Sequence, residues 1–386
     1  MTRPPLKGMT WSHPRGLDPL LACSSDYLRA FGVEIKWDAR SLQDFADFPL
    51  EQLTDEYDLI VFDHPFVGEI AESNLFLPLD SVFPPGTLQE LAGNSVGQSH
   101  LSYRWAEHQW AVAIDAACHV SVRRPDLHDA SLPQSWEEVI EEGRARKHRN
   151  GPLIALPLLP IDSYLALLTI VAGYTGEPFA SDGRWADNAA ASAALDQLAR
   201  LREVSHPRSV EWNPIQMLEV MSSTDDIAYA PITFGYVNYS TPGFRQSALS
   251  FDRIPTRTAA GGVLGGAGLG ISASTAFPEE AADFAQYVAS DAVQAGHYAA
   301  AGGQPGHRVA WLDRDVNQRT RNFFRDTLWG MDLSYLRPRW PGYLQAQTTA
   351  GELVHEWLTT RSISSEQLAR QLSAVFGKTF DLLSIR

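Results

Sequence analysis

The first part of the chain alternates short apolar stretches with segments that have helix-start and helix-stop signals. Leu6–Trp11 is a short apolar strand that ends in a polar, glycine-bearing turn. Asp18 as the N-cap and Pro19 at the first helical position predict a helix over 18–31, and Gly32 suits its C-terminal end. Apolar residues alternate again from position 33 to 37, which is typical of a strand.

A second apolar stretch, Asp58–Phe62, is continuous and not alternating, as expected for a parallel strand that is buried on both faces. It ends at Asp63-His64-Pro65, where the proline suits a helix start, and Ser41 is expected to cap a short helix before it. This strand–helix alternation over the first 115 residues predicts a doubly wound α/β sheet with helices on both faces.

The rest of the chain continues the mixture of strands and helices. Two strands are expected to hinge about Asp115, Ser135 is expected to cap the following helix, and the chain after residue 311 is expected to be mostly helical. The predicted strands are 109–114, 117–122, 152–156, 226–230 and 249–254, and the predicted helices are 136–146, 161–174, 188–204 and 278–290.

Composition and charge narrow the class of protein. A length of 386 residues favours two domains, and 44% hydrophobic with 20% charged residues is typical of a globular chain. A net charge of −15 argues against a nucleic-acid partner. The sequence contains no apolar run of about 18 residues, so it predicts no membrane span. Cys23 and Cys118 could pair, but two isolated buried thiols are favoured.

No segment has the residue spacing that a motif for catalysis, cofactor binding or metal binding requires. In the glycine-rich segment 261–271, Ile271 occupies the place of the third glycine of a dinucleotide fingerprint, so we expect a close backbone approach to a ligand or to an opposing strand instead. His355-Glu356 begins like a zinc-protease helix, but Thr359 replaces the second histidine. We therefore predict no catalytic residue, no cofactor and no metal.

Aromatic and polar residues instead follow several predicted strands, and open α/β sheets bind ligands at the carboxyl ends of their strands. Aromatic faces stack on sugar C–H surfaces, whereas charged and amide groups bind hydroxyls or carboxylates. For any one residue, core packing or surface exposure fits the pattern as well as ligand contact does, so the prediction depends on the whole set. Its members are Trp11, His13, Arg15, Asp63, His64, Asp162, Tyr164, Tyr229, Thr233, Tyr236 and Tyr239.

This set, in this order, resembles the extracellular solute-binding proteins of ABC transporters, in particular the family 1, sugar-binding (maltose-binding-protein-like) type. The resemblance extends over nearly the whole chain. It is carried by Leu6–Gly16, Asp58–Pro65, the strand pair around Asp115, Asp226–Pro231, Gly265–Ser272 with the helix after it, and His297–Arg308.

The resemblance implies a periplasmic-binding-protein-like type II fold, with two α/β lobes, a ligand cleft and three hinge crossings near Asp115, Pro255 and Ala310. Lobe I would comprise 1–114 and 256–310, and lobe II would comprise 115–255 and 311–386. The first lobe would contribute Trp11, His13, Arg15, Asp63 and His64, and the second Tyr164, Tyr229, Thr233 and Tyr236. Asp115, Arg308 and Trp340 are further candidates.

The function implied is non-catalytic binding of a small polar solute, a sugar or a hydroxylated or carboxylated metabolite, for ABC-type uptake. Arg15 and His13 near a helix N-terminus favour an acidic group on the solute, unless Arg15 pairs with Asp18. We expect Arg15→Ala to weaken binding by about 2 kcal/mol with little loss of stability. The alternatives are a transferase or hydrolase that uses Asp63 and His64, and a cytoplasmic ligand sensor.

Partners and location follow from the same resemblance. We expect a monomer that binds a small molecule and can dock on an ABC permease. The family is exported, but the first strand begins near residue 6 with no secretory signal before it. We therefore expect a cytoplasmic location in preference to a periplasmic one.

Overall fold

A computed structural model describes residues 4–41, 50–129, 131–179, 185, 187–256 and 261–383. The chain divides into two compact units. Unit 1 comprises Met1–Ala117, Tyr236–Asn238 and Gly265–Arg325, and unit 2 comprises Cys118–Gly235, Tyr239–Leu264 and Asp326–Arg386. Each unit is therefore assembled from three separate stretches of the chain.

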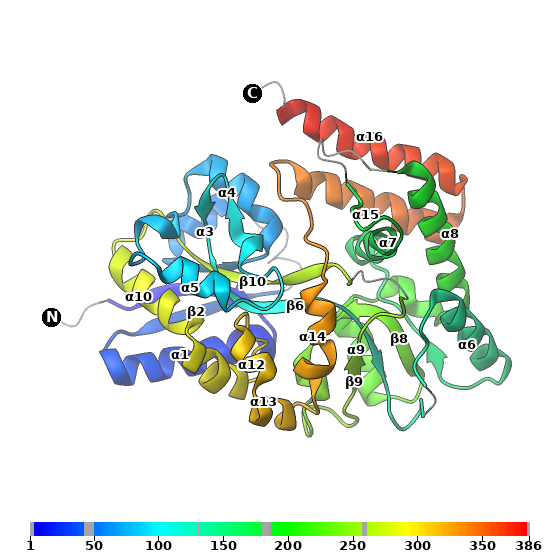
Figure 1. Cartoon of the computed structure of the whole chain (residues 1–386), viewed down its shortest axis with the longest axis horizontal. Helices are drawn as coiled ribbons and strands as arrows, with labels where there is room; N and C mark the ends of the chain where they lie inside the picture. Colours follow the sequence, from blue (N-terminus) through cyan, green and yellow to red (C-terminus); the bar gives the residue numbers. More distant parts are fainter. Residues whose placement is uncertain are drawn as a thin grey trace. The chain divides into compact units, whose positions relative to one another are not determined.

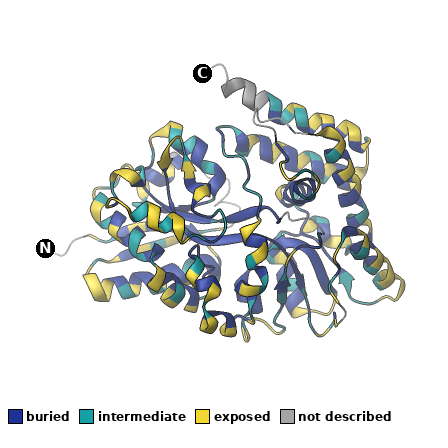
Figure 2. Ribbon diagram, viewed as in Figure 1, coloured by how far each residue is buried: buried dark blue, intermediate teal, exposed yellow. Residues whose placement is uncertain are grey.

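The sheet of unit 1 is parallel where the sequence predicts parallel strands. β1 (Leu6–Trp11) lies between β2 (Ile35–Arg40) and β3 (Leu59–Phe62) and pairs with both in parallel. All four residues of β3 are buried, as its continuous apolar run predicts. Figure 2 shows that most of the strands are coloured as buried. β10 (Leu264–Ile271) runs antiparallel to β3, and the sheet continues to β6 (Val112–Arg123), which starts in unit 1 and ends in unit 2.

The glycine-rich segment forms β10, and its glycines allow close packing. A Cβ atom at Gly268 would lie 2.6 Å from the ring of Tyr103, and one at Gly270 would lie 2.7 Å from the ring of Phe62. Gly266 has a φ of +120°, which favours glycine, and a Cβ atom at this position would press on the carbonyl oxygen of Asp115. The expected close approach to an opposing strand is confirmed.

Helices cover the unit 1 sheet through a shared apolar core. α1 (Pro14–Phe31) and α10 (Pro278–Ala289) contribute Tyr27 and Phe284, whose rings meet edge to face at 5.2 Å. Unit 1 also contains α3 (Leu50–Glu56), α4 (Val67–Ser73), α5 (Thr87–Gly93), α11 (Asp291–Val293), α12 (Arg308–Leu312), α13 (Arg314–Arg319) and the hairpin β4 (Arg104–Trp105) with β5 (His108–Gln109). α14 (Phe323–Asp332) continues into unit 2.

Unit 2 has a smaller sheet and a layer of helices. β8 (Ile227–Phe234) pairs with β6 in the antiparallel sense and with β7 (Leu153–Ile154) in parallel, and β9 (Ser250–Asp252) also pairs with β6. α7 packs against α8 and α15, and α16 packs against α8 (Figure 1). The helices are α6 (Trp136–His148), α7 (Pro160–Thr175), α8 (Asn188–Val204), α9 (Pro214–Ser223), α15 (Tyr343–Thr360) and α16 (Ser365–Leu383).

Two predicted element boundaries are wrong. α1 begins at Pro14 and not after Asp18, because His13 supplies the N-cap and Pro14 the first helical position, so Pro19 lies inside the helix. Residues 112–123 form one strand and not two hinged at Asp115, because the backbone beside Asp115 pairs with Pro305. The helix expected after Ser41 falls on 42–49, outside the described residues.

Other predictions are confirmed in detail. α8 has the predicted bounds, and the side chain of Ser135 caps α6 by accepting a hydrogen bond from the N–H of Glu138. Cys23 and Cys118 are both buried and free, and burial raises the pKa of each thiol to about 12. Both thiols are therefore protonated and unreactive at neutral pH.

Candidate functional site

The turn after β1 is fixed by its own side chains. The indole of Trp11 lies against Gly16, in the space that a Cβ at that position would need. His13 caps α1, and its Nδ1 accepts a hydrogen bond of 3.0 Å from the N–H of Arg15. A neutral imidazole that accepts at Nδ1 carries its hydrogen on Nε2, so Nε2 of His13 can donate a hydrogen bond.

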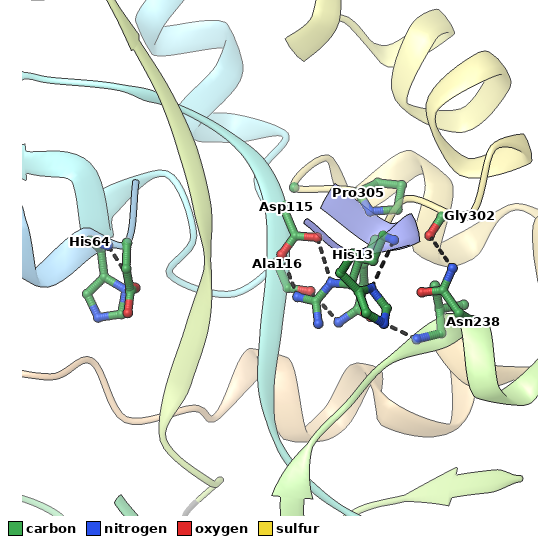
Figure 3. Close-up of polar contacts among 12 residues, drawn as sticks. His13, His64, Asp115, Ala116, Asn238, Gly302 and Pro305 are labelled. Atoms are coloured by element: carbon green, nitrogen blue, oxygen red, sulfur yellow. Dashed lines mark hydrogen bonds and ion pairs between the residues drawn. The ribbon is translucent and has the colours of Figure 1, made fainter. Parts of the chain in front are cut away.

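Arg15 forms a buried, bidentate ion pair with Asp115 (Figure 3). Nε and Nη2 of Arg15 donate to the two carboxylate oxygens at 2.8 and 2.5 Å, and the two residues are 4% and 1% exposed. Burial alone would lower the pKa of Arg15, but the charge of Asp115 and the hydrogen bonds to it raise that pKa. Burial raises the pKa of Asp115, and Arg15 opposes that rise.

Two tyrosines complete this group of side chains. The guanidinium carbon of Arg15 lies 4.6 Å from the ring centre of Tyr236, and the ring of His13 meets the same tyrosine edge-on at 5.1 Å. Tyr298 is fully buried, and it lies close enough to Arg15 and Asp115 to interact with their charges. We call His13, Arg15, Asp115, Tyr236 and Tyr298, all in unit 1, the Arg15 cluster.

The Arg15 cluster does not offer a net positive charge. Asp115 neutralises Arg15, and the negative charge of Asp63 is near enough to raise the pKa of Asp115 further. The alternative pairing of Arg15 with Asp18 is wrong, because the partner is Asp115. The predicted preference for an acidic solute is not supported, because it depended on an uncompensated Arg15.

The other predicted residues of unit 1 lie outside this cluster. The carboxylate of Asp63 accepts a hydrogen bond of 2.8 Å from the N–H of His64, and the imidazole of His64 is fully buried with its edge toward Tyr103. Figure 3 shows His64 apart from His13 and Asp115. Arg308 is half-buried, and its N–H donates to the carbonyl of Asn94.

In unit 2, the predicted residues pack in the interior. Tyr164 is fully buried, with its hydroxyl 3.2 Å from that of Tyr343, and Tyr229 is fully buried against the ring of His128. Thr233 is buried in β8, and Trp340 lies edge-on to Phe179. For Tyr164 and Tyr229 the structure therefore shows core packing, which was the alternative to ligand contact.

The position of Tyr236 differs from the expected one. We expected it in the second lobe, but Tyr236–Asn238 belongs to unit 1, where its ring contacts Arg15 and His13. The structure thus brings together four of the predicted residues, namely His13, Arg15, Asp115 and Tyr236.

Sequence analysis did not single out Tyr298 and Gln304, which also belong to this region. Gln304 is buried and bonded to the backbone at Ala116 and Val237. Both residues lie within the segment 297–308 that carries the family resemblance. Gly303 in this segment is the sequence signal that could have indicated a bulky side chain packed against the backbone here. The ring of Tyr298 occupies the space beside Gly303 that any side chain there would need.

In unit 2, Asp162 is chemically the most unusual of the residues predicted from the sequence. It lies in the first turn of α7 and is 7% exposed, and among the described residues no hydrogen-bond or ion-pair partner accompanies it. Burial raises the pKa of Asp162 to about 8, so the carboxyl is largely protonated at neutral pH.

Within the described ranges, no three or more His, Cys, Asp or Glu residues gather in a way that could hold a metal ion. In the same part of the chain, every helix is too short or too polar to cross a membrane.

Comparison with known families agrees with this architecture. A family model described as bacterial extracellular solute-binding protein matches residues 29–295. The chain belongs to this family. No curated protein sequence matches the chain at a significant level.

Solved structures of the same fold come from several bacteria. The maltose-bound MalE3 protein of T. maritima has a TM-score of 0.80 and 16% identity over 98% of this chain and 99% of that one. An ABC transporter solute-binding protein of Agrobacterium radiobacter K84, with ribitol, has a TM-score of 0.81 and 17% identity over 97% and 98%. An ABC transporter solute-binding protein of Thermotoga lettingae TMO, with alpha-D-tagatose, has a TM-score of 0.83 and 14% identity over 98% of this chain and 100% of that one.

Family membership decides the class of function. The protein is a non-catalytic solute-binding protein, and the enzyme alternative that used Asp63 and His64 is set aside. The geometry agrees, because His64 is enclosed beside Tyr103 and its carboxylate neighbour serves as a local cap.

Proposed function

We propose that the protein binds a small, uncharged polyhydroxylated solute, a sugar or a sugar alcohol, and that the Arg15 cluster contributes to its binding site. The observation that carries this proposal is the buried pair of Arg15 with Asp115. A matched pair of charges attracts neutral hydroxyl groups without favouring an anion, since hydroxyls both donate and accept hydrogen bonds.

The aromatic members of the cluster support the same class of solute. The rings of Tyr236 and His13 stand edge to face beside the guanidinium, so polar groups and aromatic faces occur together. Such a combination suits molecules that carry both C–H faces and hydroxyl groups. Several solved structures of this fold are named with uncharged solutes of this kind, namely maltose, ribitol, alpha-D-tagatose and D-mannitol.

A thermal-shift screen followed by calorimetry tests the proposal. The panel pairs neutral solutes with their acids: maltose with maltobionate, D-mannitol with D-mannonate, and ribitol with ribonate. A solute present at 100 times its Kd should stabilise the protein by about 2.7 kcal/mol. We expect neutral members to raise Tm more than their acids. Stabilisation by the acids alone would overturn the proposal, and native mass spectrometry can identify a solute that copurifies.

The partner, the oligomeric state and the use of the two units belong to the same proposal. Family membership supports docking on an ABC permease and participation of both units in solute binding. A monomer is expected, and light scattering coupled to gel filtration would detect a dimer. The family description favours an extracellular location over the cytoplasmic one, and fractionation of the cells that make the protein would test it.

A further inference from the structure

One buried amide is bonded to two of the stretches at which the chain passes between the units. The chain leaves unit 1 after Ala117 and visits it again at Tyr236–Asn238. The side chain of Gln304, which is 1% exposed, bonds to both stretches on the unit 1 side. Its Nε2 donates to the carbonyl of Ala116 at 2.8 Å, and its Oε1 accepts from the N–H of Val237 at 3.1 Å.

Both of these backbone groups adjoin members of the Arg15 cluster. Ala116 follows Asp115, the partner of Arg15, and Val237 follows Tyr236, whose ring lies over the guanidinium. The N–H of Ala116 also donates to the backbone carbonyl of Gln304 at 2.8 Å. Gln304 therefore fixes the distance between the residues next to Asp115 and Tyr236.

The segment that presents Gln304 is itself fixed to unit 1. The N–H of Gly306 donates to the carbonyl of Ile114 and to Oε1 of Gln294, and the indole of Trp311 donates to the carbonyl of Pro305 at 2.7 Å. On the other side of Gln304, the amide of Asn238 donates to the carbonyl of Gly302 at 3.3 Å (Figure 3). The segment that carries Gln304 is thus bonded to both neighbouring stretches, through Gly302 and Gly306, and is also held by Trp311, which lies in neither stretch.

We infer that Gln304 is a positioning residue for solute binding, which holds the ring of Tyr236 beside the Arg15–Asp115 pair at the passage between the units. At neutral pH, a glutamine amide offers a donor at one end and an acceptor at the other, whereas a glutamate carboxylate only accepts. The inference rests on the proposed function, because it concerns the same cluster. It adds that the geometry of the cluster depends on a residue that need not touch the solute.

The chain supplies a matched control for this role. Gln294 is also fully buried in unit 1, and its amide also uses both ends, with Oε1 accepting from the N–H of Gly306 and Nε2 donating to the carbonyl of Val288. Neither of its two bonds reaches Ala116 or Val237, and Gly306 keeps its bond to the carbonyl of Ile114 when Gln294 is replaced. The variants Gln304→Leu and Gln294→Leu therefore remove the same chemistry from different places.

Amide hydrogen exchange on the full chain without solute is the first measurement. In Gln304→Leu, we expect exchange at Val237 to accelerate by about tenfold or more, because a buried bond is lost. In Gln294→Leu, we expect faster exchange at Gly306 and an unchanged rate at Val237. Equal rates at Val237 in Gln304→Leu and the native protein would overturn the inference, whether or not the protein binds sugars.

Calorimetry with maltose and ribitol is the second measurement. For whichever solute the native protein binds, Gln304→Leu should weaken binding about tenfold, whereas Gln294→Leu should change it less than about twofold. Gln304→Glu should recover affinity as the pH falls, because a protonated carboxyl again donates at one end and accepts at the other. Equal losses in the two leucine variants, or no recovery, would contradict the positioning role. Binding of neither solute would count against the proposed function, while the exchange result would still decide the position of Val237.

Discussion

A buried guanidinium that donates two hydrogen bonds to a buried carboxylate affects the stability of the protein more than an exposed arginine does. Each charge alone would be costly to remove from water, and the pair is tolerated because each partner satisfies the other. Arg15 and Asp115 are in this situation, with two short hydrogen bonds between them. Their role in stability is therefore inseparable from any role in binding.

The first prediction concerns removal of one partner. Arg15→Ala should destabilise the protein by about 3 to 5 kcal/mol, because it leaves Asp115 buried without a counter-charge. This replaces our expectation of a variant with little loss of stability. Urea unfolding measures the change, and the double variant Arg15→Met with Asp115→Leu should recover much of the loss. A single variant as stable as the native protein would contradict the structural role of the pair.

The second prediction concerns Asp162, whose pKa burial raises to about 8. The unfolded chain gives up this proton near pH 4, so between pH 4 and 8 the unfolded state binds fewer protons than the folded state. The associated stability is present at low pH and is lost as the pH rises toward 8, by up to ~1.4 kcal/mol per pH unit.

Asp162→Asn keeps the shape and removes the titration. The difference in unfolding free energy between this variant and the native protein should grow in favour of the variant from pH 5 to pH 8. Chemical unfolding at several pH values measures it, and groups common to both proteins, such as the buried His119, cancel. A difference that does not change with pH would mean that the carboxyl is charged in the folded state.

At the scale of elements, the sequence predicts best where one local signal has no competitor. Ser135 has no rival as the cap of α6, and the periodicity of α8 defines its bounds. α1 offers two starts of the same kind, His13-Pro14 and Asp18-Pro19, and the structure uses the earlier one. A histidine is a less common cap than an aspartate, so local preference favoured the wrong pair.

The candidate site could be predicted only in part, for a physical reason. Proximity to strand ends identified Arg15 and Asp115 separately, but the bond between them joins positions 100 residues apart. No local pattern shows which charges will pair across that separation. Tyr164 and Tyr229 are tyrosines near predicted strand ends, as Tyr236 is, so the sequence does not distinguish the three. Only the fold shows that Tyr164 and Tyr229 are enclosed within their own unit, whereas the ring of Tyr236 contacts Arg15.

The third prediction concerns β10. Gly266→Ala should destabilise the protein by about 2 to 4 kcal/mol, because its φ of +120° disfavours a side chain and the new Cβ would press on the carbonyl of Asp115. Gly93→Ala is the control, because a Cβ at Gly93 meets no atom within 4 Å. Thermal unfolding compares the two, and an equal Tm in both variants would show that β10 can shift away from β6.

At the scale of the whole molecule, the repeated passage of the chain between two units determines which motions are open to it. The chain changes unit after Ala117, Leu264 and Arg325, and also at the short stretch Tyr236–Asn238. Several covalent connections restrict the units to hinge-like movement, whereas a single linker would leave them independent. A solute that contacts both units would then favour one hinge position over the others.

The fourth prediction is that a saturating solute lowers the radius of gyration in small-angle scattering. A ligand can shift such an equilibrium only by its difference in affinity for the two states, so weak binding should give a partial decrease that grows with occupancy. Tyr236→Ala is the comparison, because it removes the ring beside Arg15 and should need more solute for the same decrease. An unchanged radius of gyration in the native protein, at a concentration where calorimetry shows full occupancy, would mean that the solute contacts one unit only. The Arg15 cluster would then have to supply the whole binding site from unit 1.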